Sequence, residues 1–264
     1  MPDWFAIVLL GIIEGITEFL PISSTGHLLI AEHTGWLPLQ SDLFNVVIQC
    51  GAVLAVLPLF PERLRQFCLG WREPATQEYL LKIVAAFGIT GVGGLLLERG
   101  GFILPEKLLP VAIAMLVGGI LFLIVESWLR DRPLSDRVSW TIVVAVGLGQ
   151  LIAAVFPGTS RSGATILMAL ALGLSRPAAT EFSFLVGIPT MLAAGGLKIF
   201  KHLRHPSGGA PENWTLLLLG AVVAAVVSFI AVRWLLHYVR THTFRAFGYY
   251  RLAVGALLFV LLIW

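Results

Sequence analysis

Two glutamates four residues apart, Glu14 and Glu18, lie in an otherwise apolar segment near the start of the chain. A helix places residues four apart on one face, so both carboxyl groups point the same way. Like charges at this spacing repel each other, and a divalent cation such as Mg²⁺ or Ca²⁺, which prefers carboxylate oxygens, removes the repulsion. The pair therefore predicts a metal site, unless one or both carboxyl groups are protonated and hydrogen-bonded in a core.

A polar break, PISSTGH at positions 21–27, follows the glutamates. Pro21 ends the first helix and Ser23 or Ser24 caps the next, which leaves free backbone N–H groups and the positive end of a helix dipole. His27 lies one turn beyond Ser24, so its imidazole can approach the Ser24 hydroxyl or a phosphate-bound water. The alternative is a histidine hydrogen-bonded to a loop carbonyl.

A second break, PGTSRSGAT at positions 157–165, has the same features, with Thr159 or Ser160 as the cap and Arg161 at the helix start. If the two breaks meet, two helix N-termini and a guanidinium form an anion site, and beside a metal this is a phosphate or diphosphate site. The hydroxyl groups around it are those of Ser24, Thr25, Ser160, Ser162 and Thr165. Alternatively, Arg161 is a structural salt-bridge partner of the glutamates, and the hydroxyls are ordinary caps.

These groups supply what cleavage of a phosphoanhydride needs, namely charge neutralisation, an in-line nucleophile and a proton donor for the leaving phosphate. Arg161 and the amides of Ser160 and Ser162 stabilise the transferring phosphoryl group. Ser24 or an activated water attacks it, and His27 is the base or the nucleophile itself. The residues do not decide among these nucleophiles, nor between the two metals.

The elements that position these residues are membrane helices. Of the 264 residues, 58% are hydrophobic and 12% are charged, against about 45–50% and about 25% in soluble domains. A mean hydropathy of +0.90 excludes a soluble globular enzyme. The net charge of +3 is concentrated in loops, where it reports membrane orientation and excludes nucleic acid as a partner. Cys50 and Cys68 have no metal-ligand spacing and exclude a disulfide framework.

Six uninterrupted apolar segments are long enough to span a bilayer, and they cover residues 43–60, 79–97, 108–125, 182–200, 214–236 and 246–264. Two others, 4–31 and 140–174, are interrupted by the polar breaks, and we expect them to form re-entrant helical hairpins. The chain is therefore predicted to be an all-α polytopic membrane protein, with a single integral membrane domain over residues 1–264.

An internal repeat relates the two hairpins. Shifting the sequence by 136 positions pairs Trp4 with Trp140, Glu14 with Gln150, Pro21 with Pro157 and Ser24 with Ser160. Each unit, about 1–130 and 137–264, is a hairpin plus three transmembrane helices. Because three is odd, the second unit enters the membrane upside down, which predicts two inverted-topology repeats whose broken tips meet near the midplane.

Loop charges give the orientation. If the first hairpin opens outward, twelve basic residues are cytoplasmic: Arg63, Arg65, Arg72, Lys82, Arg130, Arg132, Arg137, Arg176, Arg233, Arg240, Arg245 and Arg251. Five lie outside: Arg99, Lys107, Lys198, Lys201 and Arg204. The excess predicts both termini outside, although the basic loop at 198–204 argues against it.

The motifs EGITEFLPISSTGH (14–27) and PGTSRSGAT (157–165), followed by EFSF (181–184), resemble the signature regions of the bacterial undecaprenyl-diphosphate phosphatases of the bacitracin-resistance type. The resemblance covers essentially the whole chain. It implies hydrolysis of undecaprenyl diphosphate to undecaprenyl phosphate and inorganic phosphate, with a divalent cation, to recycle the carrier lipid for cell-wall synthesis and confer bacitracin resistance. The implied active-site residues are Glu14, Glu18, Ser160 and Arg161, with Ser24, His27 and Thr165 at further functional positions.

The resemblance also implies a multi-pass protein of the bacterial cytoplasmic (inner) membrane whose site opens to the periplasmic face. Its partners are then the lipid substrate and membrane lipids, and a homodimer stays open because the sequence does not fix the oligomeric state. A rival function keeps the same site, because inverted repeats with broken helices are also used by transporters. A polyprenyl-phosphate flippase would bind the head group without cleaving it.

Overall fold

The computed structural model describes residues 2–33, 35, 37–101, 108–204 and 212–263, and within them the fold is all-α. Ser135 and Leu174 form an isolated β-bridge between two loops. The helices are α1 (Asp3–Thr17), α2 (Ser24–His33), α3 (Asp42–Val56), the 3-10 helix η1 (Leu57–Leu59), α4 (Pro61–Leu69), α5 (Pro74–Arg99), α6 (Leu108–Trp128), α7 (Trp140–Val155), α8 (Arg161–Ala171), α9 (Arg176–Arg204), α10 (Trp214–Tyr238) and α11 (Arg245–Ile263).

Within the described residues, six helices are long and apolar enough to cross a membrane, and they coincide with the six predicted spans: α3 with η1, α5, α6, α9, α10 and α11. The all-α polytopic fold class is therefore confirmed. The largest boundary difference is in α9, which begins at Arg176 and not at residue 182. A proline in a first helical turn costs no backbone hydrogen bond, so Pro177 lets the helix extend into the polar residues before the apolar segment.

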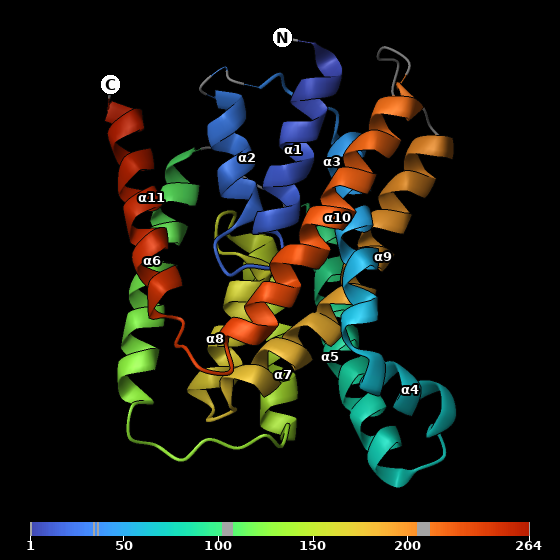
Figure 1. Ribbon diagram of the computed structural model, residues 1–264, viewed down its shortest axis with the longest axis vertical. Helices are drawn as coiled ribbons and strands as arrows, with labels where there is room; N and C mark the ends of the chain where they lie inside the picture. The colour runs from blue at the N-terminus through green and yellow to red at the C-terminus, as the bar shows by residue number, and fades with distance from the viewer. Residues whose placement is uncertain (1, 34, 36, 102–107, 205–211, 264) are drawn as a thin grey trace.

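The two interrupted segments each form a pair of short helices. Chain direction differs between the pairs, because α1 starts at the end of the molecule that carries both termini and α7 starts at the opposite end (Figure 1). With 15 residues, α1 is about 22 Å long at 1.5 Å per residue, which is less than the roughly 30 Å hydrocarbon core of a bilayer. The helix breaks consequently lie inside the molecule.

Helix contacts have a paired arrangement. α1 packs on α10 and α7 packs on α5, while α3 contacts α10 and α9 contacts α5. Exchanging α1 with α7, α3 with α9, and α5 with α10 converts each of these contacts into another that is present. This is the arrangement that the sequence repeat predicts, and the repeat with its two unit boundaries stays a prediction.

Glycines let the first arm of each hairpin approach a spanning helix closely. A Cβ atom on Gly15 of α1 would lie 2.7 Å from the Ala224 carbonyl oxygen of α10. A Cβ atom on Gly147 of α7 would lie 2.9 Å from the Cβ atom of Ile89 in α5. Small residues at such contacts are typical of helix packing in membranes, where close backbone approach replaces the hydrophobic driving force.

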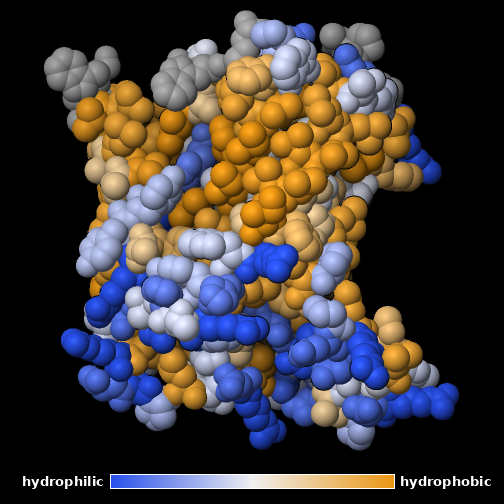
Figure 2. Space-filling view, in the orientation of Figure 1, coloured by the Kyte–Doolittle hydropathy of each residue, from blue (hydrophilic) through white to orange (hydrophobic). Residues whose placement is uncertain are grey.

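Hydrophilic residues gather at the end of the molecule that holds α4 and the start of α7, whereas apolar side chains cover most of the other end (Figure 2). Two residues of the predicted cytoplasmic group of basic residues are not exposed. Lys82 and Arg251, expected among the loop cations, are buried at 5% and 0% exposure. Lys107 lies outside the described residues.

Candidate functional site

Each hairpin tip is built around a capping serine. Ser23 and Ser160 both have positive φ angles, 74° and 68°. The hydroxyl oxygen of Ser23 accepts a hydrogen bond from the Gly26 N–H at 3.3 Å, and that of Ser160 accepts one from the Gly163 N–H at 3.1 Å. Both predicted cap positions are thus occupied, and Arg161 begins its helix as expected.

The two caps are 137 positions apart in the sequence, one more than the shift of 136 that aligns the preceding helices. The predicted pairing of Ser24 with Ser160 is therefore wrong by one residue at the tips. The starts of α1 at Asp3 and of α7 at Trp140 are likewise 137 positions apart. In the corrected pairing, Ser24 corresponds to Arg161, so equivalent positions of the two tips carry a hydroxyl and a guanidinium.

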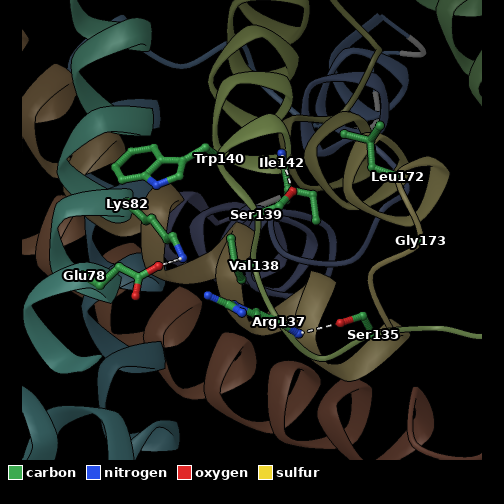
Figure 3. A pocket seen from close by; sticks show the side chains of 10 residues that line it. All are labelled: Glu78, Lys82, Ser135, Arg137, Val138, Ser139, Trp140, Ile142, Leu172 and Gly173. Atoms are coloured by element: carbon green, nitrogen blue, oxygen red, sulfur yellow. Dashed lines mark hydrogen bonds and ion pairs between the residues drawn. The ribbon is translucent and has the colours of Figure 1, made fainter. Parts of the chain in front are cut away.

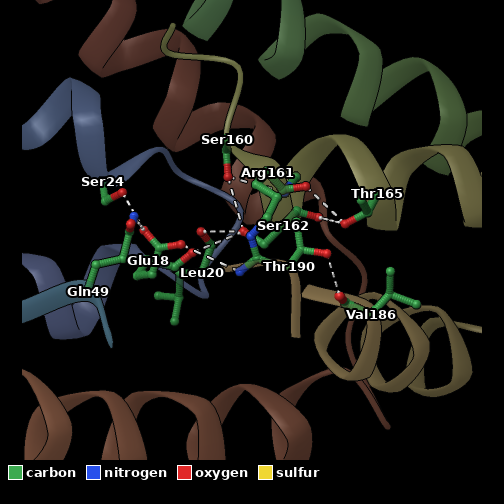
Figure 4. Close-up of polar contacts among 11 residues, drawn as sticks. Glu18, Leu20, Ser24, Gln49, Ser160, Arg161, Ser162, Thr165, Val186 and Thr190 are labelled. Carbon is green, nitrogen blue, oxygen red and sulfur yellow. Dashed lines mark hydrogen bonds and ion pairs between the residues drawn. The ribbon is translucent and has the colours of Figure 1, made fainter. Parts of the chain in front are cut away.

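Glu18, at the C-terminal end of α1, joins the two tips (Figure 4). Its Oε2 atom accepts hydrogen bonds from the Ser24 hydroxyl at 2.7 Å and from Gln49 Nε2 of α3 at 3.3 Å. Its Oε1 atom lies 3.5 Å from Nη2 of Arg161. A carboxylate, a hydroxyl and a guanidinium from segments far apart in sequence thus meet in the molecular interior.

The Arg161 guanidinium is only partly used by the protein. Its side chain is 13% exposed, and the single ion pair with Glu18 leaves Nε and Nη1 without a hydrogen-bond partner among the described residues. The group lies 5.5 Å from the centre of the Phe19 ring and against Gly187 of α9, where a Cβ atom would be 1.6 Å from Nη1. Two buried N–H groups therefore remain available to an anion.

The other hydroxyl groups of the second tip have structural partners. Ser162 is buried and its hydroxyl donates to the carbonyl oxygens of Leu20 at 3.2 Å and Glu18 at 3.4 Å, which ties the two tips together. The Thr165 hydroxyl donates within its own helix, to the carbonyl oxygens of Arg161 at 2.9 Å and Ser162 at 3.1 Å. These groups shape the site, whereas Thr25 is exposed beside Ser24.

The surroundings of Glu14 are compatible with the divalent cation that its spacing from Glu18 predicts. Its side chain is 2% exposed, and the only side-chain interaction recorded for its carboxyl group in the described part of the chain is with Glu18. Within those residues, no cluster of three or more His, Cys, Asp or Glu side chains could hold a metal. Mg²⁺ is commonly bound by one or two carboxylates, and oxygen atoms of water and phosphate complete its coordination shell.

His27 does not make its expected contact. Its Nδ1 atom donates to the Ser23 carbonyl oxygen at 2.7 Å, and its Nε2 atom lies 2.8 Å from the hydroxyl oxygen of Tyr250 in α11. The structure therefore shows the alternative in which His27 is hydrogen-bonded to a loop carbonyl, and not the approach of the imidazole to the Ser24 hydroxyl. The Ser23 carbonyl oxygen also accepts the backbone N–H of His27 at 3.4 Å.

Three residues at the tips were missed by the sequence analysis: Gln49, Tyr250 and Arg251. A signal existed for two of them, because Gln49 and Arg251 are polar residues inside predicted spans, where an unpaired polar group is costly. Tyr250 gave none, since tyrosine is common at membrane interfaces.

A separate cavity of about 450 Å³ lies at the base of the second hairpin, between the starts of α5 and α7 (Figure 3). Glu78, Lys82, Arg137 and Trp140 are among its lining residues, and the lysine and glutamate form an ion pair at 2.6 Å. None of the predicted site residues lines it.

Comparison with known proteins gives consistent results over the whole chain. A family model described as bacitracin resistance protein BacA matches residues 7–257. A Rhizobium etli protein named undecaprenyl-diphosphatase is 50% identical over 257 residues, covering 97% of this chain and 96% of its own length. Proteins of the same name from Xanthomonas euvesicatoria pv. vesicatoria and Xylella fastidiosa are 48% and 47% identical over 265 residues, covering all of this chain and 98% and 99% of their own lengths.

Proposed function

The chain belongs to the bacitracin resistance protein BacA family, and on this premise we propose that it hydrolyses undecaprenyl diphosphate to undecaprenyl phosphate and inorganic phosphate. The observation that carries the proposal is the contact between Glu18 and Arg161, which joins the two tips and leaves two buried guanidinium N–H groups free. The reaction recycles the carrier lipid for cell-wall synthesis, and a larger supply of that lipid accounts for bacitracin resistance.

Glu14 and Glu18 are the residues that would hold the divalent cation, Mg²⁺ or Ca²⁺. When bound, such an ion neutralises diphosphate oxygens and lowers the cost of developing negative charge. The fit rests on the donor set, which is two neighbouring carboxyl groups, and in the described part of the chain no basic side chain pairs with Glu14.

Arg161 and the N-terminus of α8 bind the transferring phosphoryl group. Nε and Nη1 of Arg161 have no partner among the described residues. The Gly163 N–H donates to the Ser160 hydroxyl, which leaves the backbone N–H groups of Arg161 and Ser162 in the first helical turn to donate to an anion. A guanidinium can contact two phosphate oxygens at once, which fixes orientation as well as charge. Because these groups are buried, they keep bulk water away from the phosphoanhydride, except where the nucleophile attacks.

Ser24 is the favoured nucleophile. Its hydroxyl already donates to Glu18 at 2.7 Å, so the carboxylate can take the proton as the oxygen attacks the terminal phosphorus and undecaprenyl phosphate leaves. Water, with His27 as its base, then hydrolyses the phosphoserine and releases inorganic phosphate. His27 is held by the Ser23 carbonyl and Tyr250, and its role as a proton donor to the leaving phosphate requires the contact with Tyr250 to open. Water activated in the same place is the alternative nucleophile.

Membrane placement follows from the same premise. We assign the protein to the bacterial cytoplasmic membrane, with both termini and the mouth of the first hairpin at the outer face. The predicted excess of cytoplasmic basic residues and the hydrophilic end opposite the termini support this orientation (Figure 2). The long prenyl tail then stays in the lipid while the head group reaches the tips. The comparisons give no support to the flippase alternative, since the matched relatives are named as diphosphatases.

Purified protein in detergent is expected to release inorganic phosphate from undecaprenyl diphosphate only when a divalent cation is present. Chelation with EDTA should abolish release, and added Mg²⁺ or Ca²⁺ should restore it; the more effective ion identifies the preferred metal. Detergent removes any distinction between membrane sides, so phosphate release cannot be produced by transport. Binding of the lipid without phosphate release would contradict the proposed hydrolysis and favour the flippase.

The variants Ser24→Ala and His27→Ala are expected to separate the nucleophiles. If Ser24 attacks phosphorus, a phosphoenzyme formed from substrate labelled in the terminal phosphate accumulates in His27→Ala and is absent in Ser24→Ala. The measurement is mass spectrometry of protein denatured at alkaline pH in the cold, which preserves an acid-labile phosphohistidine, with a parallel acid quench that preserves only phosphoserine. A phosphoenzyme in Ser24→Ala that is missing in His27→Ala would assign the attack to the imidazole, and its absence in both would assign it to water.

A further inference from the structure

Arg251 of α11 is a buried cation that the mechanism above does not use. Its residue exposure is 0%, and no carboxylate pairs with it among the described residues. Its partners are backbone carbonyl oxygens: Nη1 donates to Pro21 at 3.2 Å, and Nη2 donates to Gly158 at 3.1 Å and to Ala114 of α6 at 3.0 Å. An ionisable group in the membrane interior is expensive and needs a specific reason to be there.

The two tip carbonyls give that reason. Pro21 and Gly158 lie in the helix breaks, and neither carbonyl oxygen accepts a backbone hydrogen bond in the described part of the chain. In a region without bulk water, each unpaired carbonyl costs several kcal/mol unless a donor of the protein reaches it. One guanidinium therefore satisfies the freed backbone of both hairpins at once.

We propose that Arg251 is the positioning residue that holds the two hairpin tips in register, so that Glu18 and Ser24 from the first tip meet Arg161 from the second. This inference rests on the proposed function. Arg251 acts on the reaction through the backbone of the breaks and has no assigned contact with the substrate. The glycine at position 118 of α6 leaves room for it, because a Cβ atom there would lie 2.3 Å from Nη2.

The contact that Arg251 supports is sensitive to small shifts. Glu18 and Arg161 are already 3.5 Å apart, near the limit of a charge-assisted hydrogen bond. Ser162 provides a second link between the tips, at 3.2 Å to the Leu20 carbonyl, so loss of Arg251 should loosen the tips without separating them. Misplacement of catalytic groups by about 1 Å can cost about 100-fold in rate.

The test compares Arg251→Met, which removes the donors but keeps the side-chain length, with Arg176→Met as a matched control. Arg176 is also a guanidinium of the membrane domain, but it pairs with Glu126 at the other end of α6. Spin labels on cysteines introduced at the exposed residues Thr25 and Phe156 report the distance between the tips. Cys50 and Cys68 are replaced by serine in this background.

Arg251→Met is expected to broaden the distance distribution, and in unlabelled protein to lower kcat at least about tenfold with KM changed less than about threefold. Arg251→Lys should restore part of both, whereas Arg176→Met should lower only the thermal unfolding temperature. An unchanged distribution, the same broadening in Arg176→Met, or a rise in KM with a narrow distribution would overturn the inference. If the unsubstituted protein cleaves no undecaprenyl diphosphate, the proposed function fails, and the distance measurement still decides the role of Arg251.

Discussion

Replacing Arg161 with alanine is expected to lower kcat/KM for undecaprenyl diphosphate by about 1,000-fold, equivalent to about 4 kcal/mol of transition-state stabilisation. The reason is that its Nε and Nη1 atoms are buried donors at the meeting point of the tips and have no partner among the described residues. The variant should still insert, because the residue contributes only one 3.5 Å ion pair to the fold. The measurement is phosphate release by purified protein, with membrane insertion checked separately.

The control for this prediction is Arg63→Ala. Arg63 pairs with Glu181 at 2.6 Å, far along the chain from the tips, and its side chain is 34% exposed. A second variant, Gly187→Ala, keeps the guanidinium but displaces it, because the ideal Cβ position is 1.6 Å from the present position of Nη1. We expect Gly187→Ala to lose at least about tenfold in kcat/KM, since donors must match the transition state closely. Turnover of Arg161→Ala within tenfold of the unsubstituted protein would refute its role.

The variant Glu18→Gln is expected to lower kcat at least about 100-fold and to raise the concentration of Mg²⁺ needed for half-maximal activity at least about tenfold. The amide keeps the shape of the side chain but removes the negative charge. It therefore weakens three interactions at once: the proposed metal bond, the pairing with Arg161, and the hydrogen bond that accepts the Ser24 proton. Initial rates over a Mg²⁺ titration give both quantities.

Two comparisons make the Glu18 result specific. Glu181→Gln removes a carboxylate that pairs with Arg63, and it should leave the metal requirement unchanged. Glu14→Gln should raise the metal requirement as Glu18→Gln does, but with a smaller loss of kcat, because Glu14 does not contact Ser24 or Arg161. If Glu18→Gln needs no more Mg²⁺ than the unsubstituted protein, Glu18 is not a metal ligand.

The fold could be predicted because the length of an apolar segment indicates whether it spans the membrane. A spanning helix must satisfy all of its backbone hydrogen bonds within itself, so an apolar segment of sufficient length has one available structure. For this reason the starts of α6 at Leu108 and α10 at Trp214 coincide with the predicted positions. The start of α9 was predicted too late because polar residues can also be helical. The length of an apolar segment does not show where its helix begins in the interfacial region of the membrane.

The meeting of Glu18 with Arg161 was predictable from the pairing of two broken segments of opposite insertion. The orientation of the His27 side chain could not be predicted. Helical spacing indicates on which face of a helix a residue lies, but it does not indicate which partner binds its imidazole ring. That partner is the Ser23 carbonyl oxygen, which accepts both the ring Nδ1–H and the backbone N–H of His27. The one-residue offset between the tips was missed as well, because the match of Pro21 with Pro157 does not show which of the following serines caps the next helix.

Arg251 shows where sequence reasoning stops. Its position near the start of a predicted span is typical of a basic residue at the membrane surface. Arg251 was therefore predicted to be one of the cytoplasmic loop cations. Arg251 is held in the interior by one carbonyl group from each helix break. The Pro21 carbonyl is 230 residues away in the sequence, and the Gly158 carbonyl is 93 residues away. Such contacts are set by the docking of α11 on α6, which local sequence patterns do not encode.

The docking of α11 also bears on biosynthesis. The groups at the tips come from α1, α3, the start of α8 and α11, so a nascent chain emerging from the ribosome carries the acidic pair long before the guanidinium that holds both breaks in place. Until α11 has inserted beside α6, the freed carbonyls of Pro21 and Gly158 lack their donor. Translation that halts before the final helix therefore leaves no working hydrolase in the bilayer, and enzymatic competence arrives only with the last stage of membrane insertion.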